Sequence, residues 1–159
     1  MRNIFSILFL CYLTASGLQA QVVINELHYN PDGSADDTEF IELWNTGEAT
    51  VDISGWTMSD GVDFTFPGGT ILPAGGFAVI ARYPAIFSSI YPWVGTVYGP
   101  FLNDTKLKNS GERVAISNSS NVVSEITYND ESPWPTEPDG DGVSLELLHP
   151  LLDLNNALS

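Results

Sequence analysis

Three glutamates interrupt short apolar stretches of the sequence, where a partly buried carboxylate could do chemistry: Glu26, Glu42 and Glu146. Each needs a partner, because removing an unpaired carboxylate from water costs several kcal/mol. One interpretation is a pairing role, with Arg82 or Arg113, with loop amides, or at a solvated strand end. The other is a shared cation or protonation site. We favour pairing.

The alternation of side chains along a strand predicts the neighbours of these glutamates. Glu26 then shares a face with Ile24, and Glu42 shares a face with Trp44. Trp44 and Trp56 both fall in strand patterns, so we expect both indoles to lie in the core. The glutamates would then stand beside buried apolar groups.

Acidic loops offer a second kind of site, for a hard cation. Several aspartates stand near glycines, and carboxylate oxygens are the ligands that Ca²⁺ prefers: Asp32, Asp36, Asp37, Asp139 and Asp141. The helix–loop–helix calcium pattern is absent, and the Asp-Gly-Asp-Gly stretch over 139–142 lacks a bidentate glutamate at the required distance. Asp-Gly pairs more often form simple turns, since glycine adopts positive φ. We expect turns and no cofactor, with Asp36, Asp37, Asp139 and Asp141 as weak candidates for Ca²⁺.

The usual signatures of catalysis are absent from the sequence. His28 and His149 lack metal-ligand spacing. There is no Gly-x-Ser-x-Gly nucleophile elbow and no glycine-rich phosphate loop between a strand and a helix. Paired carboxylates can hydrolyse sugars, but chance pairs are unavoidable among 20 acidic residues. We therefore predict that the protein is not an enzyme.

Aromatic side chains in predicted loops are a better lead to a ligand. Trp93, Tyr98 and Trp134 fall in segments rich in glycine and proline. Loop aromatics at one edge of a sandwich can stack on sugars or hold a peptide. The alternative, which we favour, is that these loops fold over a sheet and use the rings as local core.

The candidate site residues must be positioned by β-strands, which the sequence shows as short apolar runs separated by Gly, Pro, Asn and Asp. The predicted strands span residues 22–27, 39–44, 51–53, 56–58, 62–66, 70–72, 77–82, 113–117, 122–128 and 143–148. A helical turn is predicted over 84–91 and a long ordered loop over 91–102. Turn residues every ~8–12 positions, without sustained helical periodicity, are typical of an all-β sandwich or barrel.

The first 20 residues are interpreted as a signal peptide, with cleavage after Ala20. Arg2 precedes an apolar run over 4–13, and small residues follow it. The run is too short for a membrane-spanning helix; a buried strand or a membrane anchor is the alternative. We expect a domain over 21–150, a polar, frayed tail over 151–159, and a secreted, cell-surface or periplasmic location without a transmembrane segment.

The charge balance excludes some partners. The 5 basic and 20 acidic residues give a net charge of −15, which loss of Arg2 with the leader takes to −16. Such a surface repels phosphate backbones and anionic membranes, so we expect no direct binding of nucleic acid. The single cysteine, Cys11, leaves with the leader, so we expect no disulfide. A protein or a surface glycan is the expected partner.

An ordered series of short stretches resembles the lamin tail domain in its bacterial, extracellular form. The stretches that carry the resemblance are Ile24-Asn25-Glu26-Leu27, Glu39-Phe40-Ile41-Glu42-Leu43, Val51-Asp52-Ile53-Ser54-Gly55-Trp56, Leu72-Pro73-Ala74-Gly75-Gly76-Phe77, Asn109-Ser110-Gly111-Glu112-Arg113-Val114, Trp134-Pro135, Asp139-Gly140-Asp141-Gly142 and Ser144-Leu145-Glu146-Leu147. The resemblance covers roughly residues 22 to 150. It implies an immunoglobulin-like antiparallel β-sandwich.

The resemblance also implies a non-catalytic module for binding a protein or surface ligand, or for structural support. Bacterial lamin tail domains are usually exported accessory modules, often beside hydrolase, nuclease or spore-coat-kinase-like domains. An accessory domain of a larger exported hydrolase or nuclease is therefore one alternative, and a calcium-dependent adhesion module is another. The family usually carries an Asn-Trp close that this chain lacks after Asn155-Asn156, so it stays open whether the chain is a fragment.

Overall fold

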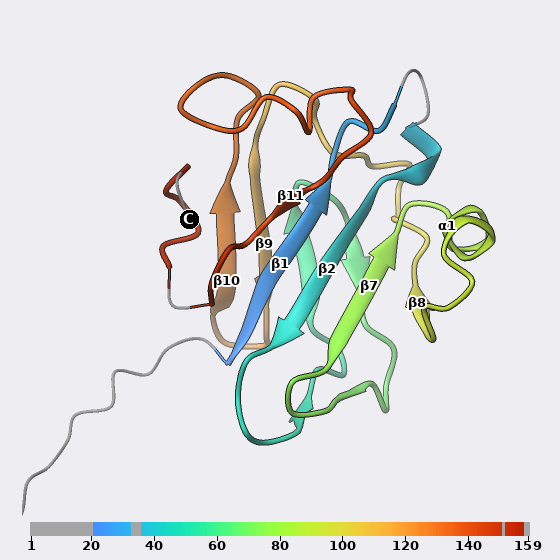
Figure 1. Cartoon of the computed structure of the whole chain (residues 1–159). Coiled ribbons are helices and arrows are strands. Elements are labelled where there is room, and N and C mark those ends of the chain that lie inside the picture. Colours follow the sequence, from blue (N-terminus) through green and yellow to red (C-terminus); the bar gives the residue numbers. More distant parts are fainter. Residues whose placement is uncertain (1–20, 33–35, 151, 158–159) are drawn as a thin grey trace, which may run out of the picture.

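Two β-sheets packed face to face form the body of the molecule (Figure 1). The structure is a computed structural model that describes residues 21–32, 36–150 and 152–157. The expected signal peptide over 1–20 lies outside the described residues. Because the two sheets enclose one apolar core, the predicted all-β, immunoglobulin-like sandwich is confirmed.

The larger sheet has five strands, in the order β11-β1-β2-β7-β8. Their bounds are Leu145–Glu146 for β11, Val22–His28 for β1, Phe40–Asn45 for β2, Phe77–Ala81 for β7 and Val97–Tyr98 for β8. Neighbours pair antiparallel except β7 and β8, which pair parallel. The predicted strand over 143–148 is therefore reduced to two residues, and the loop predicted over 91–102 contains a short strand.

The smaller sheet has four strands, in the order β10-β9-β4-β5. These are Val122–Thr127 for β10, Arg113–Ser117 for β9, Thr57–Asp60 for β4 and Phe64–Thr65 for β5. A further pair joins β3 (Val51–Asp52) to β6 (Ile71–Leu72). The short 3-10 helix η1 (Asp36–Thr38) precedes β2.

The core lies between the sheets, and β2 shows how alternation builds it. Ile41 and Leu43 are fully buried on the inner face, whereas Glu42 and Trp44 are half-buried on the outer face. Each buried aliphatic side chain of this size stabilises the fold by about 1.5–3 kcal/mol. Trp44 was expected in the core, and that prediction is wrong: its ring stacks on exposed Phe77 of β7 at 5.7 Å. Alternation places it beside Glu42, on the face away from the core.

Strand β1 departs from simple alternation at Asn25. Ile24 lies opposite Leu43 in β2, and the next paired residue, Glu26, lies opposite Glu42. Asn25 is thus an extra residue, a β-bulge, which lets the residues before and after it keep their own faces. The prediction that Glu26 shares a face with Ile24 is wrong, because this bulge turns Glu26 to the outer face.

Helix α1 (Pro84–Ile90) covers one end of that outer face (Figure 1). It begins at Pro84, whose missing N–H costs nothing in the first turn, and ends before Pro92 as predicted. Its one buried residue, Phe87, packs against Phe40, Val79 and Ala81 in a second, smaller apolar cluster. This part of the outer face is therefore apolar and covered by the helix.

The C-terminal tail lies along β10 (Figure 1). The side chain of Asn155 accepts a hydrogen bond from the Thr127 N–H at 2.8 Å, and Leu154 packs against the main core. The expectation of a frayed tail is wrong for residues 152–157, because these contacts give it a place on the edge of β10. Residues 151, 158 and 159 lie outside the described part. None of the helices in the described part is long and apolar enough to cross a membrane.

Asn45 ties the end of β2 to two neighbouring loops. Its fully buried side chain donates to the carbonyls of Ala49, Leu72 and Pro73 at 2.9, 3.1 and 2.8 Å and accepts from the Gly47 N–H at 3.0 Å. A buried polar group that loses its partner costs about 1–3 kcal/mol.

Asn45→Ala is therefore expected to lower the free energy of unfolding by about 3 kcal/mol. Denaturant titration followed by tryptophan fluorescence measures the change. Asn121→Ala, at an exposed position before β10, is the matched control and should shift the free energy by less than about 0.5 kcal/mol. Equal midpoints for the two variants would contradict the anchoring role of Asn45.

Candidate functional site

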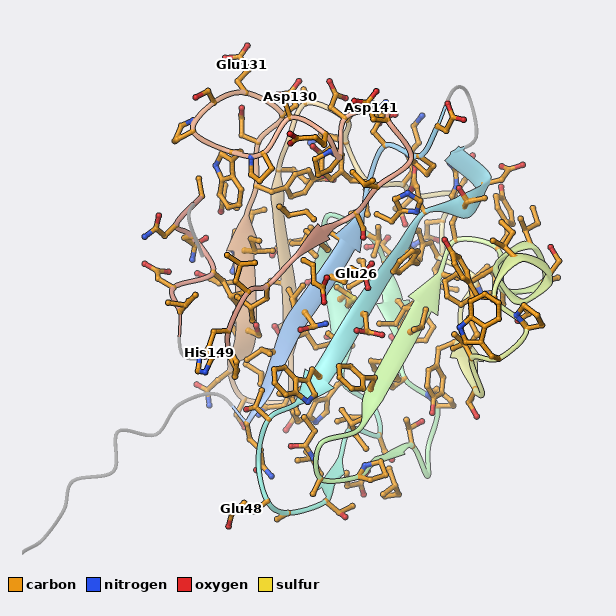
Figure 2. The ribbon with its side chains drawn as sticks, in the orientation of Figure 1. Glu26, Glu48, Asp130, Glu131, Asp141 and His149 are labelled. Atoms are coloured by element: carbon orange, nitrogen blue, oxygen red, sulfur yellow. The ribbon has the colours of Figure 1, made fainter. Side chains whose placement is uncertain are left out.

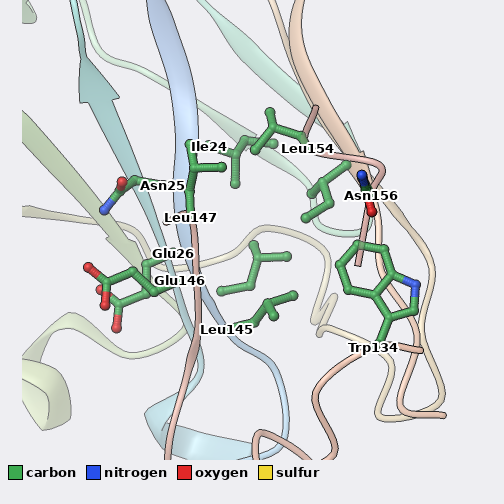
Figure 3. A pocket seen from close by; sticks show the side chains of 11 residues that line it. Ile24, Asn25, Glu26, Trp134, Leu145, Glu146, Leu147, Leu154 and Asn156 are labelled. Carbon is green, nitrogen blue, oxygen red and sulfur yellow. The ribbon is translucent and has the colours of Figure 1, made fainter. Parts of the chain in front are cut away.

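Three carboxylates lie side by side on the outer face of the larger sheet. Glu26 of β1 is the register partner of both Glu42 in β2 and Glu146 in β11. Figure 3 shows the side chains of Glu26 and Glu146 pointing the same way, away from Leu145 and Trp134. The structure thus brings together the three glutamates that the sequence singled out, and we name them the acidic row.

Uncharged side chains hold two members of the acidic row. The hydroxyl of Ser144 donates to the Glu26 carboxylate. The amide of Asn25, which the bulge places on the same face, donates to Glu42 at 2.8 Å. These bonds orient the carboxylates without neutralising them.

The predicted partners Arg82 and Arg113 pair elsewhere. Arg82 follows β7 and lies 3.5 Å from Glu39, while Arg113, on β9 of the other sheet, pairs with Asp60 and Glu125. Arginine, one of the three kinds of partner considered for these glutamates, thus pairs with other acids. The reason is the topology, because Arg113 lies on the opposite sheet and Arg82 pairs with the more deeply buried Glu39.

That buried acid, Glu39, was missed as a site residue. Its side chain is fully buried, and one oxygen accepts a hydrogen bond from the Leu107 N–H at 3.0 Å. Arg82 approaches the other oxygen. Its position at the start of an apolar run could have indicated that Glu39 is buried. A buried carboxylate needs a cationic partner, and the chain has few cations. The pair is structural.

The environment of the acidic row favours protonation. Burial raises the pKa of Glu26. The hydrogen bond from Ser144 opposes this rise, and the charge of the neighbouring Glu146 adds to it. Burial likewise raises the pKa of Glu42, and Glu26 and Glu146 add to the effect. Like charges directly opposite on neighbouring strands repel. Glu26 and Glu42 therefore take up protons more readily than isolated glutamates do.

His28 ends β1 beside the acidic row. Together with Glu26, Glu146 and Tyr91 it lines a hollow of about 330 Å³. Burial lowers the pKa of His28, an effect that the nearby carbonyls of Thr38 and Gly142 oppose. The imidazole is therefore mostly neutral at neutral pH and does not balance the charge of the row.

A second hollow, of about 440 Å³, lies beside β11 at the edge of the larger sheet. Its wall includes Trp134, Val143, Leu145 and Leu148, with Glu146 at the rim. Val143 and Leu148 are 47% and 76% exposed, so this hollow has an exposed apolar wall. We name this hollow the C-terminal groove. Behind it, between Trp134 and Leu145, lies a cavity of about 20 Å³ (Figure 3).

The loop aromatics proposed as ligand contacts are not brought together. Trp93 is 76% exposed near α1, edge-on to Tyr91 at 5.8 Å. Tyr98 is half-buried in β8, edge-on to Phe66 at 5.1 Å. Trp134 packs against the core on the far side of the larger sheet, at the C-terminal groove. A role in ligand contact stays a prediction for each of them.

The acidic loops lie at one end of the sandwich, where Figure 2 labels Asp130, Glu131 and Asp141. Asp139 accepts a hydrogen bond from the side chain of Asn30. Gly140 and Gly142 adopt positive φ, as the predicted turns require.

The remaining aspartate candidates, Asp36 and Asp37, lie in η1. Within the described ranges, no group of three or more His, Cys, Asp or Glu side chains is placed to hold a metal ion. Calcium binding by Asp36, Asp37, Asp139 and Asp141 stays a prediction.

Glu42→Gln is expected to stabilise the protein in a pH-dependent way. A pKa raised above its ordinary value of 4.5 means that stability is lost as pH rises through the pKa of the folded state. The glutamine side chain does not ionise, so the variant does not lose stability in this way, and its amide oxygen can still accept the hydrogen bond from Asn25. The variant should match the parent near pH 4 and exceed it by roughly 0.5 kcal/mol at pH 7. Thermal unfolding across this pH range measures the difference.

Glu48→Gln is the control for this experiment, because Glu48 is exposed in a loop far from the acidic row (Figure 2). The difference in stability between Glu48→Gln and the parent should not vary with pH. A Glu42→Gln variant that is less stable than the parent at pH 7 would contradict the destabilising effect of the charged Glu42.

Comparison with known proteins agrees with this architecture. The sequence profile of the Lamin Tail Domain family matches residues 16–130, which include β1 to β10 together with Glu26 and Glu42. Strand β11, Glu146 and the C-terminal groove follow the matched range. No curated protein matches the chain. The profile covers well over half of the sequence, and the chain therefore belongs to the lamin tail domain family.

Proposed function

We propose that the protein is an exported, non-catalytic lamin tail module, of bacterial and extracellular type, that binds a partner protein or surface ligand. The observation that carries this proposal is the C-terminal groove, an exposed apolar hollow beside the acidic row on a rigid sheet. Exposed apolar patches rimmed by polar groups mark interaction sites. The leader-like first 20 residues support export.

The chemistry of the acidic row favours binding over catalysis. A carboxylate acid–base pair works when the environments of its two members push their pKa values apart. The pKa values of Glu26 and Glu42 are instead raised together, by burial and mutual repulsion. Such a row is suited to attracting cationic groups.

Export and retention on cell envelopes test this function. The full chain, expressed with its own leader in a secreting bacterial host, should appear outside the cytoplasm with Gln21 as its first residue. The exported protein should then be retained on isolated envelopes. Leu148→Glu, which places a charge in the groove, should lower retention about fivefold. Intact mass and sedimentation with envelopes are the measurements.

Val122→Glu is the matched control, since Val122 is an exposed aliphatic residue of β10, on the other sheet. Its retention should equal that of the parent. Protease treatment of the envelopes should abolish binding to a protein partner, and glycosidase treatment should abolish binding to a glycan. Equal loss for both variants, or no retention of the parent, would overturn the proposal.

Two alternatives are tested separately. Reading the gene beyond Ser159 reveals a hydrolase or nuclease if the chain is an accessory domain. For a calcium-dependent adhesion module, a chelator should lower the melting temperature by several degrees, because a ligand that binds only the native state stabilises it. We expect no change in melting temperature with chelator, as the described acidic loops form turns.

A further inference from the structure

Strand β11 is the outermost strand of the larger sheet, and no strand among residues 21–32, 36–150 and 152–157 pairs with its other edge. The Leu147 N–H donates to the Asn25 carbonyl at 2.8 Å, toward β1. Because alternate amides of a strand point to opposite edges, that of Glu146 points away from β1. A free edge of this kind is a template for another strand.

The two sides of this edge differ in chemistry. On the outer side, a residue placed opposite Glu146 would continue the acidic row, within about 5 Å of its neighbour. A lysine or arginine there would lie beside Glu146, the outermost of the three carboxylates. On the other side, the next residue of the added strand would face the part of the C-terminal groove that Trp134 and Leu145 line (Figure 3).

We propose that the β11 edge takes up an extended basic segment of another protein as an added strand. Its basic side chains alternate with aliphatic ones, so that the former complete the acidic row and the latter fill the C-terminal groove. Strand addition of this kind draws affinity from main-chain hydrogen bonds and specificity from pockets for alternate side chains. This inference rests on the proposed binding function and names the chemistry of its partner.

Charge decides between the candidate occupants. A second copy of the chain would place its own Glu146 at the same edge, and each copy carries a net charge of −15. Repulsion between like charges opposes that pairing. The basic residues 82, 106, 108 and 113 lie elsewhere on the chain and do not line the groove. A cationic partner segment is the complementary choice.

Short synthetic peptides test the proposal on the exported protein. The probe is the capped peptide Lys-Val-Lys-Val-Lys-Val. Its block isomer, Lys-Lys-Lys-Val-Val-Val, keeps charge and composition but not alternation, and Glu-Val-Glu-Val-Glu-Val reverses the charge. Calorimetric titration at low salt should show the alternating basic peptide binding at least about fivefold more tightly than either control peptide. Its affinity should fall as salt rises.

Two variants locate the binding. Glu146→Lys, at an exposed position, should weaken the alternating peptide at least about fivefold, whereas Glu48→Lys should change the affinity less than about twofold. Hydrogen exchange followed by NMR should show new protection of the Glu146 amide when the peptide binds. The Leu147 amide, already bonded to β1, should gain much less.

Several results would overturn the inference. Equal affinity for the block isomer would mean that charge alone attracts the peptide. Protection confined to α1 and Trp93 would place the site at the other edge, and dimers through β11 without peptide would make a second copy the occupant. If no peptide binds while envelopes still retain the protein, the strand-addition inference fails and the proposed function stands.

Discussion

The extra residue Asn25 in β1 decides which carboxylates of the larger sheet share a face. Without it, the alternation that buries Ile24 would also turn Glu26 toward the core, since a shift of one residue moves a side chain to the other face of a sheet. The bulge keeps both Ile24 and Leu27 inside and sends Glu26 outward, opposite Glu42. It also supplies the amide that orients Glu42. The acidic row and the charge of the β11 edge depend on this one irregularity.

Most of the sandwich could be predicted from the sequence because its longer strands carry local signals. In β2, β7, β9 and β10, apolar residues recur within short runs that end at turn residues, so their positions do not depend on distant contacts. The bulge in β1 has no such signal, because its register is set by pairing with β2. For the same reason, β8 was missed: two residues bridging to β7 in parallel show no pattern of their own.

The sequence predicted which residues belong to the candidate site, but it did not predict how they are arranged. Glutamates inside apolar runs are visible in a sequence, so Glu26, Glu42 and Glu146 could be singled out. Their mutual pairing across β11, β1 and β2 is a property of strand order. The sequence could not decide between arginine and uncharged partners, because the pairing of Arg82 with the fully buried Glu39 is set by the fold. The groove beside Trp134 depends on where the tail returns to the sandwich.

The apolar cluster beneath α1 is separate from the main core, and its size has a dynamic consequence. It contains only Phe40, Val79, Ala81 and Phe87 as buried members, and the helix contributes one of them. Segments with few buried contacts open at a lower free energy than a densely packed core. We therefore expect α1 and the neighbouring Trp93 to open locally before the strands around Ile41 do.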